Sequence, residues 1–146
     1  MEEYKKNCED ELDWVIVNQL HEATLQISKS CFEFKKICVG LLGVILTVLV
    51  KLTDGRVDDS YFFIPLLICL GFWIADFSAY YFQRKTREVM SKKLEAIASR
   101  NYIVGYQPDK LTVSWCSAAF NHSMCLYYVL AIIGCGGWII YYSIGK

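Results

Sequence analysis

Residues 61–82 read YFFIPLLICLGFWIADFSAYYF and contain a single charged side chain, Asp76. A run of this length is sufficient to cross the hydrocarbon core of a bilayer as one helix. Aromatic residues stand at both of its ends, as they do at the two interfaces of a spanning helix. We therefore predict a transmembrane helix here, which makes a soluble single-core domain the less favoured interpretation.

Two further apolar runs flank this one. Residues 124–144 carry no charge and are long enough to span, with tyrosine and tryptophan near both ends. Residues 37–50 are also uncharged but comprise only 14 residues, so the lysines on either side have to snorkel to the interfaces. With 55% apolar and 15% aromatic residues, the composition excludes a disordered protein. The predicted fold class is an all-α polytopic membrane protein with three transmembrane helices.

The charges are unevenly divided along the chain, although Lys+Arg and Asp+Glu both total 15. Residues 1–36 hold five basic and eight acidic side chains, whereas residues 84–123 hold seven basic and three acidic ones. Basic residues near a span tend to remain cytoplasmic. The pattern places the N-terminus and residues 84–123 in the cytoplasm and the C-terminus outside.

Four segments follow from these patterns. Residues 1–36 are expected to form a cytoplasmic amphipathic helix, and residues 37–83 a transmembrane hairpin. Residues 84–123 form a basic cytoplasmic arm and loop, and residues 124–146 the third transmembrane helix. Because no proline or glycine separates the first segment from the first apolar run, a single helix from about Glu9 to Leu52 is predicted, roughly 66 Å long at 1.5 Å per residue.

The two cytoplasmic arms are expected to pair. Apolar residues recur at intervals of three or four residues from Leu12 to Phe34, and Met90, Leu94 and Ile97 continue a stripe out of the second span. The first arm is acidic and the second basic, so hairpin connectivity favours an antiparallel coiled pair with complementary charges. The first stripe comprises Leu12, Ile16, Leu20, Ala23, Ile27, Cys31 and Phe34.

The loop after Asn101 has two interpretations. Alternation between Tyr102 and Trp115 about a Gln107-Pro108-Asp109 turn is typical of a small β-hairpin. A helix that starts at Pro108 and runs into the third span is the alternative, because proline fits a first helical turn.

Asp76 is a candidate functional residue, and it shares one helical face with Tyr80 and Gln83. An acidic side chain within a span usually faces a bundle interior or a water-filled cavity. Two hypotheses remain open: a structural pair with Lys36 or a tyrosine hydroxyl, and a role in a pore or gate that prefers cations.

A second candidate face lies on the first apolar run and carries Gly40, Gly43 and Thr47. Small residues allow helices to approach closely, so this face serves either helix packing or the lining of a pore. Gly134, Gly136 and Gly137 in the third span favour packing in the same way, or a bend.

The basic arm combines positive charges with aromatic side chains, which is the composition of a site for phosphates and bases. Orientation in the membrane and contact with anionic lipid explain the same charges. The candidate ligand-binding residues, for a nucleotide or a lipid phosphate, are Arg84, Lys85, Arg87, Lys92, Lys93, Arg100, Tyr102, Tyr106 and Trp115.

Signatures of enzymes are absent from the sequence, which contains no GxxxxGK[ST], GxSxG or HExxH motif. The seven cysteines form no CxxC pair, so they are expected to serve as small packing residues, with no metal site and no cofactor. A non-enzymatic membrane protein is predicted.

The order of elements resembles the small membrane effectors of bacterial nucleotide-signalled anti-phage defence, including the SLATT-like two-span and related four-span families. Phe34-Lys35-Lys36 before the first span and Gln83-Arg84-Lys85 after the second carry this resemblance. It implies a multi-pass protein of the bacterial inner membrane that forms an oligomeric pore and arrests the infected cell in response to a nucleotide or oligonucleotide signal.

Two functions are therefore expected. The first is a homo-oligomeric pore or ion channel in the lipid bilayer, gated through its cytoplasmic region, because three spans are too few to enclose a pore alone. The alternative is a non-conducting scaffold or sensor that recruits a soluble partner protein to the membrane.

Overall fold

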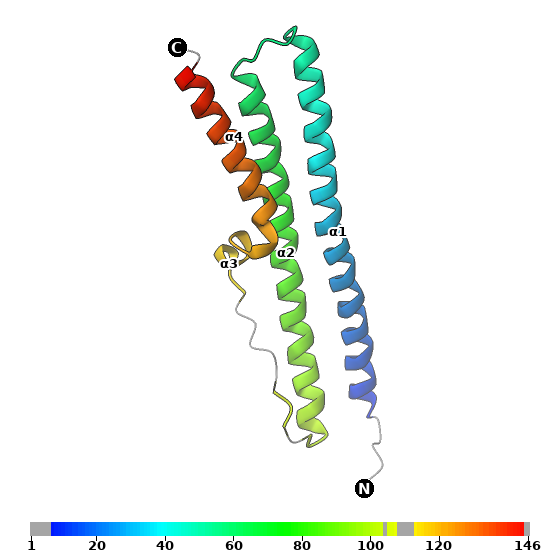
Figure 1. Cartoon of the computed structure of the whole chain (residues 1–146). Helices are drawn as coiled ribbons and strands as arrows, with labels where there is room; N and C mark the ends of the chain where they lie inside the picture. The colour runs from blue at the N-terminus through cyan, green and yellow to red at the C-terminus, as the bar shows by residue number, and fades with distance from the viewer. Residues whose placement is uncertain (1–6, 104, 108–112, 145–146) are drawn as a thin grey trace.

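The computed structural model describes residues 7–103, 105–107 and 113–144, and every regular element within these ranges is helical (Figure 1). The predicted all-α class is confirmed. In chain order the elements are helix α1 (Cys8–Leu52), helix α2 (Ser60–Arg100), the short helix α3 (Trp115–Ala119), the 3₁₀ turn η1 (His122–Met124) and helix α4 (Cys125–Ile144).

Helices α1 and α2 form a long antiparallel hairpin (Figure 1). The single helix predicted from Glu9 to Leu52 is confirmed, because α1 continues without a break for 45 residues. The chain reverses direction after it, where Gly55 has φ +77°, a left-handed conformation that glycine adopts without a steric penalty. The Asp58 carboxylate then accepts a hydrogen bond of 3.0 Å from the Ser60 backbone N–H, which shapes the turn immediately before α2.

Helix α4 packs against the half of α2 that lies nearest this turn (Figure 1). Gly134 and Gly137 allow the close approach, because a Cβ at these positions would lie 3.0 Å from Leu66 and 3.1 Å from Phe62. The packing interpretation of these glycines is thus favoured, and α4 continues through them unbroken. At its far end the Trp138 indole donates to Asp59 at 3.2 Å, which ties α4 to the turn.

Two helical segments are long and apolar enough to cross a membrane: α2, and the stretch His122–Ile144 that joins η1 to α4. Only 11% of the residues in the most apolar part of each segment are buried inside the single chain. These findings are compatible with a membrane protein, and they match the two longer of the three predicted spans.

The contact between α1 and α2 repeats every seven residues. Five buried residues of α1 are spaced by seven, and four buried residues of α2 together with the half-buried Met90 follow the same interval in the opposite direction. A seven-residue repeat is the mark of a coiled coil, so the predicted antiparallel pair is present. The five residues of α1 are Asp10, Val17, Thr24, Cys31 and Cys38. Contacts join Thr24 to Gln83, Cys31 to Asp76 and Cys38 to Cys69, and the same register places Val17 at the level of Met90 and Asp10 at the level of Ile97.

The predicted apolar stripe of the first arm describes this contact only at Cys31, which is buried. Leu12 is 63% exposed, and Ile16 and Phe34 are only partly covered, whereas Asp13, Val17 and Thr24 are buried. At about 100° per residue, the predicted stripe lies roughly 60° around the helix from the face that α2 covers. The physical reason is that polar and small residues pair across the hairpin and leave the larger apolar side chains beside it.

A β-hairpin is not observed after Asn101. Pro108, Asp109 and Leu111 lie outside the described residues, and the described residues of this loop contain no strand. Trp115 begins helix α3, because its ring stacks on Tyr81 at 4.3 Å and holds the segment against α2. The alternative of one helix running from Pro108 into the third span also fails within the described part, since Phe120 ends α3 before η1 begins.

Candidate functional site

Asp76 lies inside the molecule, between α1, α2 and the start of α4. Its side chain is fully buried, and its Oδ2 accepts a hydrogen bond of 2.5 Å from the Lys35 ammonium. Lys35 is 18% exposed and also donates to the Cys31 carbonyl at 3.3 Å. The structural pair foreseen for Asp76 is therefore formed, but its partner is Lys35 and not Lys36. Lys36 points away from α2 and pairs with Glu33 on the exposed side of α1.

Three buried polar atoms around this pair make no hydrogen bond with any described residue. They are the second carboxylate oxygen of Asp76, the hydroxyl of Tyr127 and the indole nitrogen of Trp73. Tyr127 is close enough to Asp76 to interact with it electrostatically, and its ring centroid lies 6.0 Å from the Lys35 ammonium. A buried ion pair with unsatisfied neighbours is costly to maintain, which is a common property of functional positions within membrane segments.

A second polar layer lies two helical turns further toward the N-terminal end of α1. Gln83 is buried and its amide donates to the Thr24 carbonyl at 3.4 Å and to the Ser28 hydroxyl. Asp76 and Gln83 thus both face α1, as their predicted common face requires. Tyr80, the third residue of that face, is half-buried and packs its ring 5.8 Å below the Arg84 guanidinium.

A third polar layer closes the free ends of α1 and α2. Asp10 and Asp13 are 1% and 6% exposed, and both bind Arg100, at 2.8 Å and 2.6 Å. Lys93 completes the group by donating to Asp13 at 2.8 Å, and the Asn101 amide donates to Asp10 at 2.8 Å. We call these five residues the arm latch. The predicted pairing of an acidic with a basic arm is confirmed by it.

The basic and amide side chains of the arm latch stabilise the ionised form of its two carboxylates. The Asn101 amide and then the Arg100 guanidinium hold the pKa of Asp10 below its usual value of 3.8. Hydrogen bonds from Lys93 and Arg100 lower the pKa of Asp13 in the same way. Both carboxylates are therefore ionised at neutral pH, and the two arms are joined by charge-assisted hydrogen bonds.

The predicted ligand-binding residues do not gather into one site. Arg100 and Lys93 are occupied by the arm latch, and Arg84 donates to the Ser117 hydroxyl at 2.9 Å. Of the remainder, Tyr102 is 90% exposed, and Trp115 stacks on Tyr81. Lys85, Arg87, Lys92 and Tyr106 are exposed at separate points of α2 and the following loop.

The predicted pore-facing residues of α1 are open. Gly40, Gly43 and Thr47 are all exposed, and a Cβ added at either glycine would meet no atom within 4 Å. Among the described residues of a single copy, no atom lies in van der Waals contact with the position that a side chain at either glycine would take. The Thr47 hydroxyl donates to the Gly43 carbonyl at 2.8 Å, so it is satisfied within its own helix.

Sequence reasoning missed half of the polar residues in these layers. Lys35, Thr24, Ser28, Asp10 and Asp13 were not singled out, because a charged or hydroxyl residue on a cytoplasmic arm is usually solvated. Two of them, Asp10 and Thr24, could have been found from position alone, because they lie two repeats of seven residues apart and Cys31 follows Thr24 by one repeat. Among the cysteines, Cys31, Cys38 and Cys69 are buried as expected, whereas the other four are exposed.

Comparison of the chain with protein family models, with curated proteins and with solved structures found no match. Within the described residues, no group of three or more His, Cys, Asp or Glu side chains is placed to hold a metal ion.

Proposed function

We propose that this chain is a three-span membrane protein that assembles into a homo-oligomeric, ion-conducting pore controlled by its cytoplasmic arms. Support for α1 as the third span comes from its exposed side chains. Ile37, Val44 and Val50 are 53%, 60% and 50% exposed, and four other large apolar residues between them are also exposed. In water such a surface would be unfavourable, whereas lipid covers it without cost.

The observation that carries the proposal is the open polar face of α1. Lys36, Gly40, Thr47 and Lys51 are exposed on one side of this helix, turned away from α2. Charged residues within or at the edges of a membrane segment are unfavourable toward lipid and favourable toward a water-filled space. Several copies arranged around an axis would give this face such a space, with α1 lining it.

The ion pair of Asp76 argues against the cation preference that was expected for the pore from this carboxylate. Since Lys35 neutralises Asp76 within the hairpin, the carboxylate supplies no ring of negative charge to the proposed lumen. Lys51 instead stands at the outer end of the open face, exposed and without an ion pair to any described residue. A ring of lysines in a pore attracts anions, so the proposed pore prefers anions.

Control by the cytoplasmic region is the second part of the proposal. The arm latch joins the ends of α1 and α2, and α1 continues from the arm into the proposed pore without a break. Opening of the latch would therefore act on the lining helix itself. A nucleotide signal in bacterial anti-phage defence is the control that the resemblance in architecture implies.

Current through liposomes tests the proposal. Purified full-length protein should conduct, and Lys51→Glu should shift the reversal potential in a salt gradient toward cations. Arg56→Glu is the matched control, because Arg56 is exposed in the neighbouring turn and lies outside the open face. An absence of current from an assembled oligomer, at every membrane potential and with candidate nucleotides, would refute the pore.

The alternative function, a non-conducting scaffold or sensor, is favoured by one feature. Trp14, Val15 and Leu25 are exposed on the arm of α1, beyond the reach of the hydrocarbon core. Apolar side chains outside the membrane are typical of a surface that binds another protein. The same liposome measurement separates the two functions, since a scaffold assembles without conducting.

A further inference from the structure

Two cysteines face each other across the half of the α1–α2 hairpin that lies nearest the turn. Cys38 of α1 is 0% exposed and Cys69 of α2 is 5% exposed. Their thiols interact directly between the two helices. Leu42, Met124 and Tyr127 belong to the same buried core. The dithiol is therefore enclosed by apolar and aromatic side chains.

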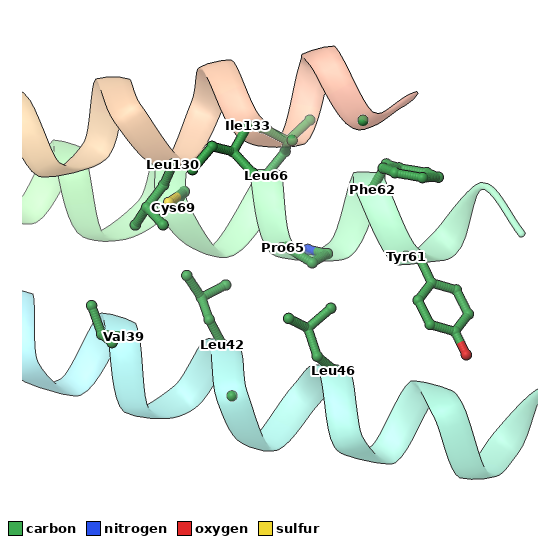
Figure 2. A pocket seen from close by; sticks show the side chains of 13 residues that line it. Val39, Leu42, Leu46, Tyr61, Phe62, Pro65, Leu66, Cys69, Leu130 and Ile133 are labelled. Carbon is green, nitrogen blue, oxygen red and sulfur yellow. The ribbon is translucent and has the colours of Figure 1, made fainter. Parts of the chain in front are cut away.

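The two cysteines differ in how they can be reached. An apolar groove of about 460 Å³ runs between α1 and α4, with α2 as its floor, and Cys69 is one of the residues that line it (Figure 2). A second apolar groove, of about 350 Å³ between α2 and α4, also reaches Cys69. Cys38 lines neither groove. A small apolar molecule that enters either groove therefore meets Cys69 first.

Both grooves open on the surface that lipid covers in the membrane placement proposed above. Val39 and Ile133 of the first groove are exposed, as is Leu70 of the second. Cys69 lies eight residues after Tyr61, about 12 Å along α2, so the dithiol stands inside a hydrocarbon core of about 30 Å.

This position separates the dithiol from the reductants of the cytosol. Glutathione and thioredoxin keep cytosolic thiols reduced. Both are charged and water-soluble, and charged molecules are strongly disfavoured in hydrocarbon. The oxidation state of the dithiol therefore depends on molecules dissolved in the lipid.

We propose that Cys38 and Cys69 form a disulfide in response to organic hydroperoxides dissolved in the membrane. In the first step the Cys69 sulfur attacks the peroxide, the O–O bond breaks, and a sulfenic acid forms at Cys69 while the alkoxide leaves with the thiol proton as an alcohol. In the second step the Cys38 sulfur attacks the sulfenic sulfur, the S–O bond breaks and water leaves. Two thiols are thus oxidised to one disulfide, and the hydroperoxide is reduced to an alcohol and water.

The register of the hairpin favours this pair over another buried cysteine. Cys31 lies one repeat before Cys38, about 10.5 Å along α1, and its thiol contacts the Asp76 carbonyl. Cysteines whose Cα atoms are more than about 7 Å apart cannot be bridged without backbone movement, so Cys31 does not compete for Cys69. A bond between Cys38 and Cys69 would hold the membrane part of α1 in its position against α2. The inference rests on the proposed membrane placement and not on the pore.

Oxidation in phosphatidylcholine liposomes tests the dithiol, in full-length protein whose four exposed cysteines are replaced by alanine. Cumene hydroperoxide should produce a disulfide between Cys38 and Cys69, detected by mass spectrometry of unreduced digests. Its reaction should be about tenfold or more faster than that of hydrogen peroxide at equal bulk concentration, because each apolar carbon favours transfer into lipid. Absence of the disulfide, or equal rates with the two peroxides, would overturn the inference, whether or not the same liposomes conduct.

Single substitutions test the order of the two steps. In Cys38→Ala a sulfenic acid should accumulate at Cys69, where dimedone added together with SDS traps it. In Cys69→Ala, Cys38 should stay reduced. Cys31→Ala is the matched control, since Cys31 is 7% exposed and lines neither groove, and it should form the disulfide at the wild-type rate. Equal trapping at Cys38 in Cys69→Ala and at Cys69 in Cys38→Ala would overturn the proposed order.

Discussion

The buried ion pair predicts a large difference between two neighbouring lysines. In Lys35→Met the Asp76 carboxylate loses the ammonium that neutralises it while its side chain stays fully buried. Breaking one side of a buried pair costs about 3–5 kcal/mol, because an uncompensated charge remains. Lys36→Met is the matched control: Lys36 pairs with Glu33 on an exposed surface where both side chains are more than half exposed. Such pairs contribute about 0–1 kcal/mol.

The free energy of unfolding in mixed micelles, titrated with SDS and followed by circular dichroism, measures both variants. We expect Lys35→Met to be destabilised several-fold more than Lys36→Met. Lys35→Met combined with Asp76→Leu should recover most of the loss, since no buried charge is left and apolar replacement of a buried pair is often neutral or stabilising. Equal stability of the two single variants would refute the buried pair. So would a double variant whose loss is the sum of the single losses, because residues in contact do not act independently.

Two other predictions concern the arms and the topology. Arg100→Ala removes the residue that both Asp10 and Asp13 bind, so amide hydrogen exchange in the first two turns of α1 should accelerate. The pKa values of both aspartates are lowered in the folded protein, so the latch contributes its full stability above pH 3.8, the usual pKa. Exchange in the wild-type protein should therefore accelerate only as the pH falls through the lowered pKa values. Membrane-impermeant maleimide should label the exposed Cys8 and Cys116 only after the bilayer is opened. A cysteine introduced by Arg56→Cys, in the turn between α1 and α2, should react from outside. Labelling of Cys116 in sealed cells would contradict the three-span topology.

The helices could be predicted from the sequence because their signals are long and redundant. The apolar runs 61–82 and 124–144 each indicate a helix, and the absence of glycine and proline between Glu9 and Ile37 joins the first arm to the first apolar run. Charge division along the chain likewise predicted that the two arms pair. These properties depend on composition and local geometry, which do not require knowledge of the partner helix.

Which residues are buried between α1 and α2 could not be predicted in the same way. Hydrophobic periodicity assumes that the most apolar face is the buried one, whereas Asp10, Thr24 and Asp76 are buried here because each finds a polar partner across the hairpin. The choice of Lys35 over Lys36 depends on a rotation of one residue, about 100°, which sequence spacing alone cannot resolve. The short helix α3 likewise depends on the stacking of Trp115 on Tyr81, a contact between residues far apart in the chain.

Because the α1–α2 contact repeats every seven residues, the hairpin can be shortened by whole repeats without changing which residues face each other. Each opposed pair, from Cys38 and Cys69 to Asp10 and Ile97, has residue numbers with the same sum, 107, so removal of residues 15–21 together with 86–92 deletes one complete repeat. The other opposed pairs and all five residues of the arm latch would then keep their relative positions. The arms would be shorter by about 10.5 Å, seven residues at 1.5 Å each. The length of the arms can thus change in steps of one repeat, independently of the rest of the hairpin, whereas a change by another number of residues would rotate Asp10 and Asp13 of the arm latch away from the α1–α2 contact.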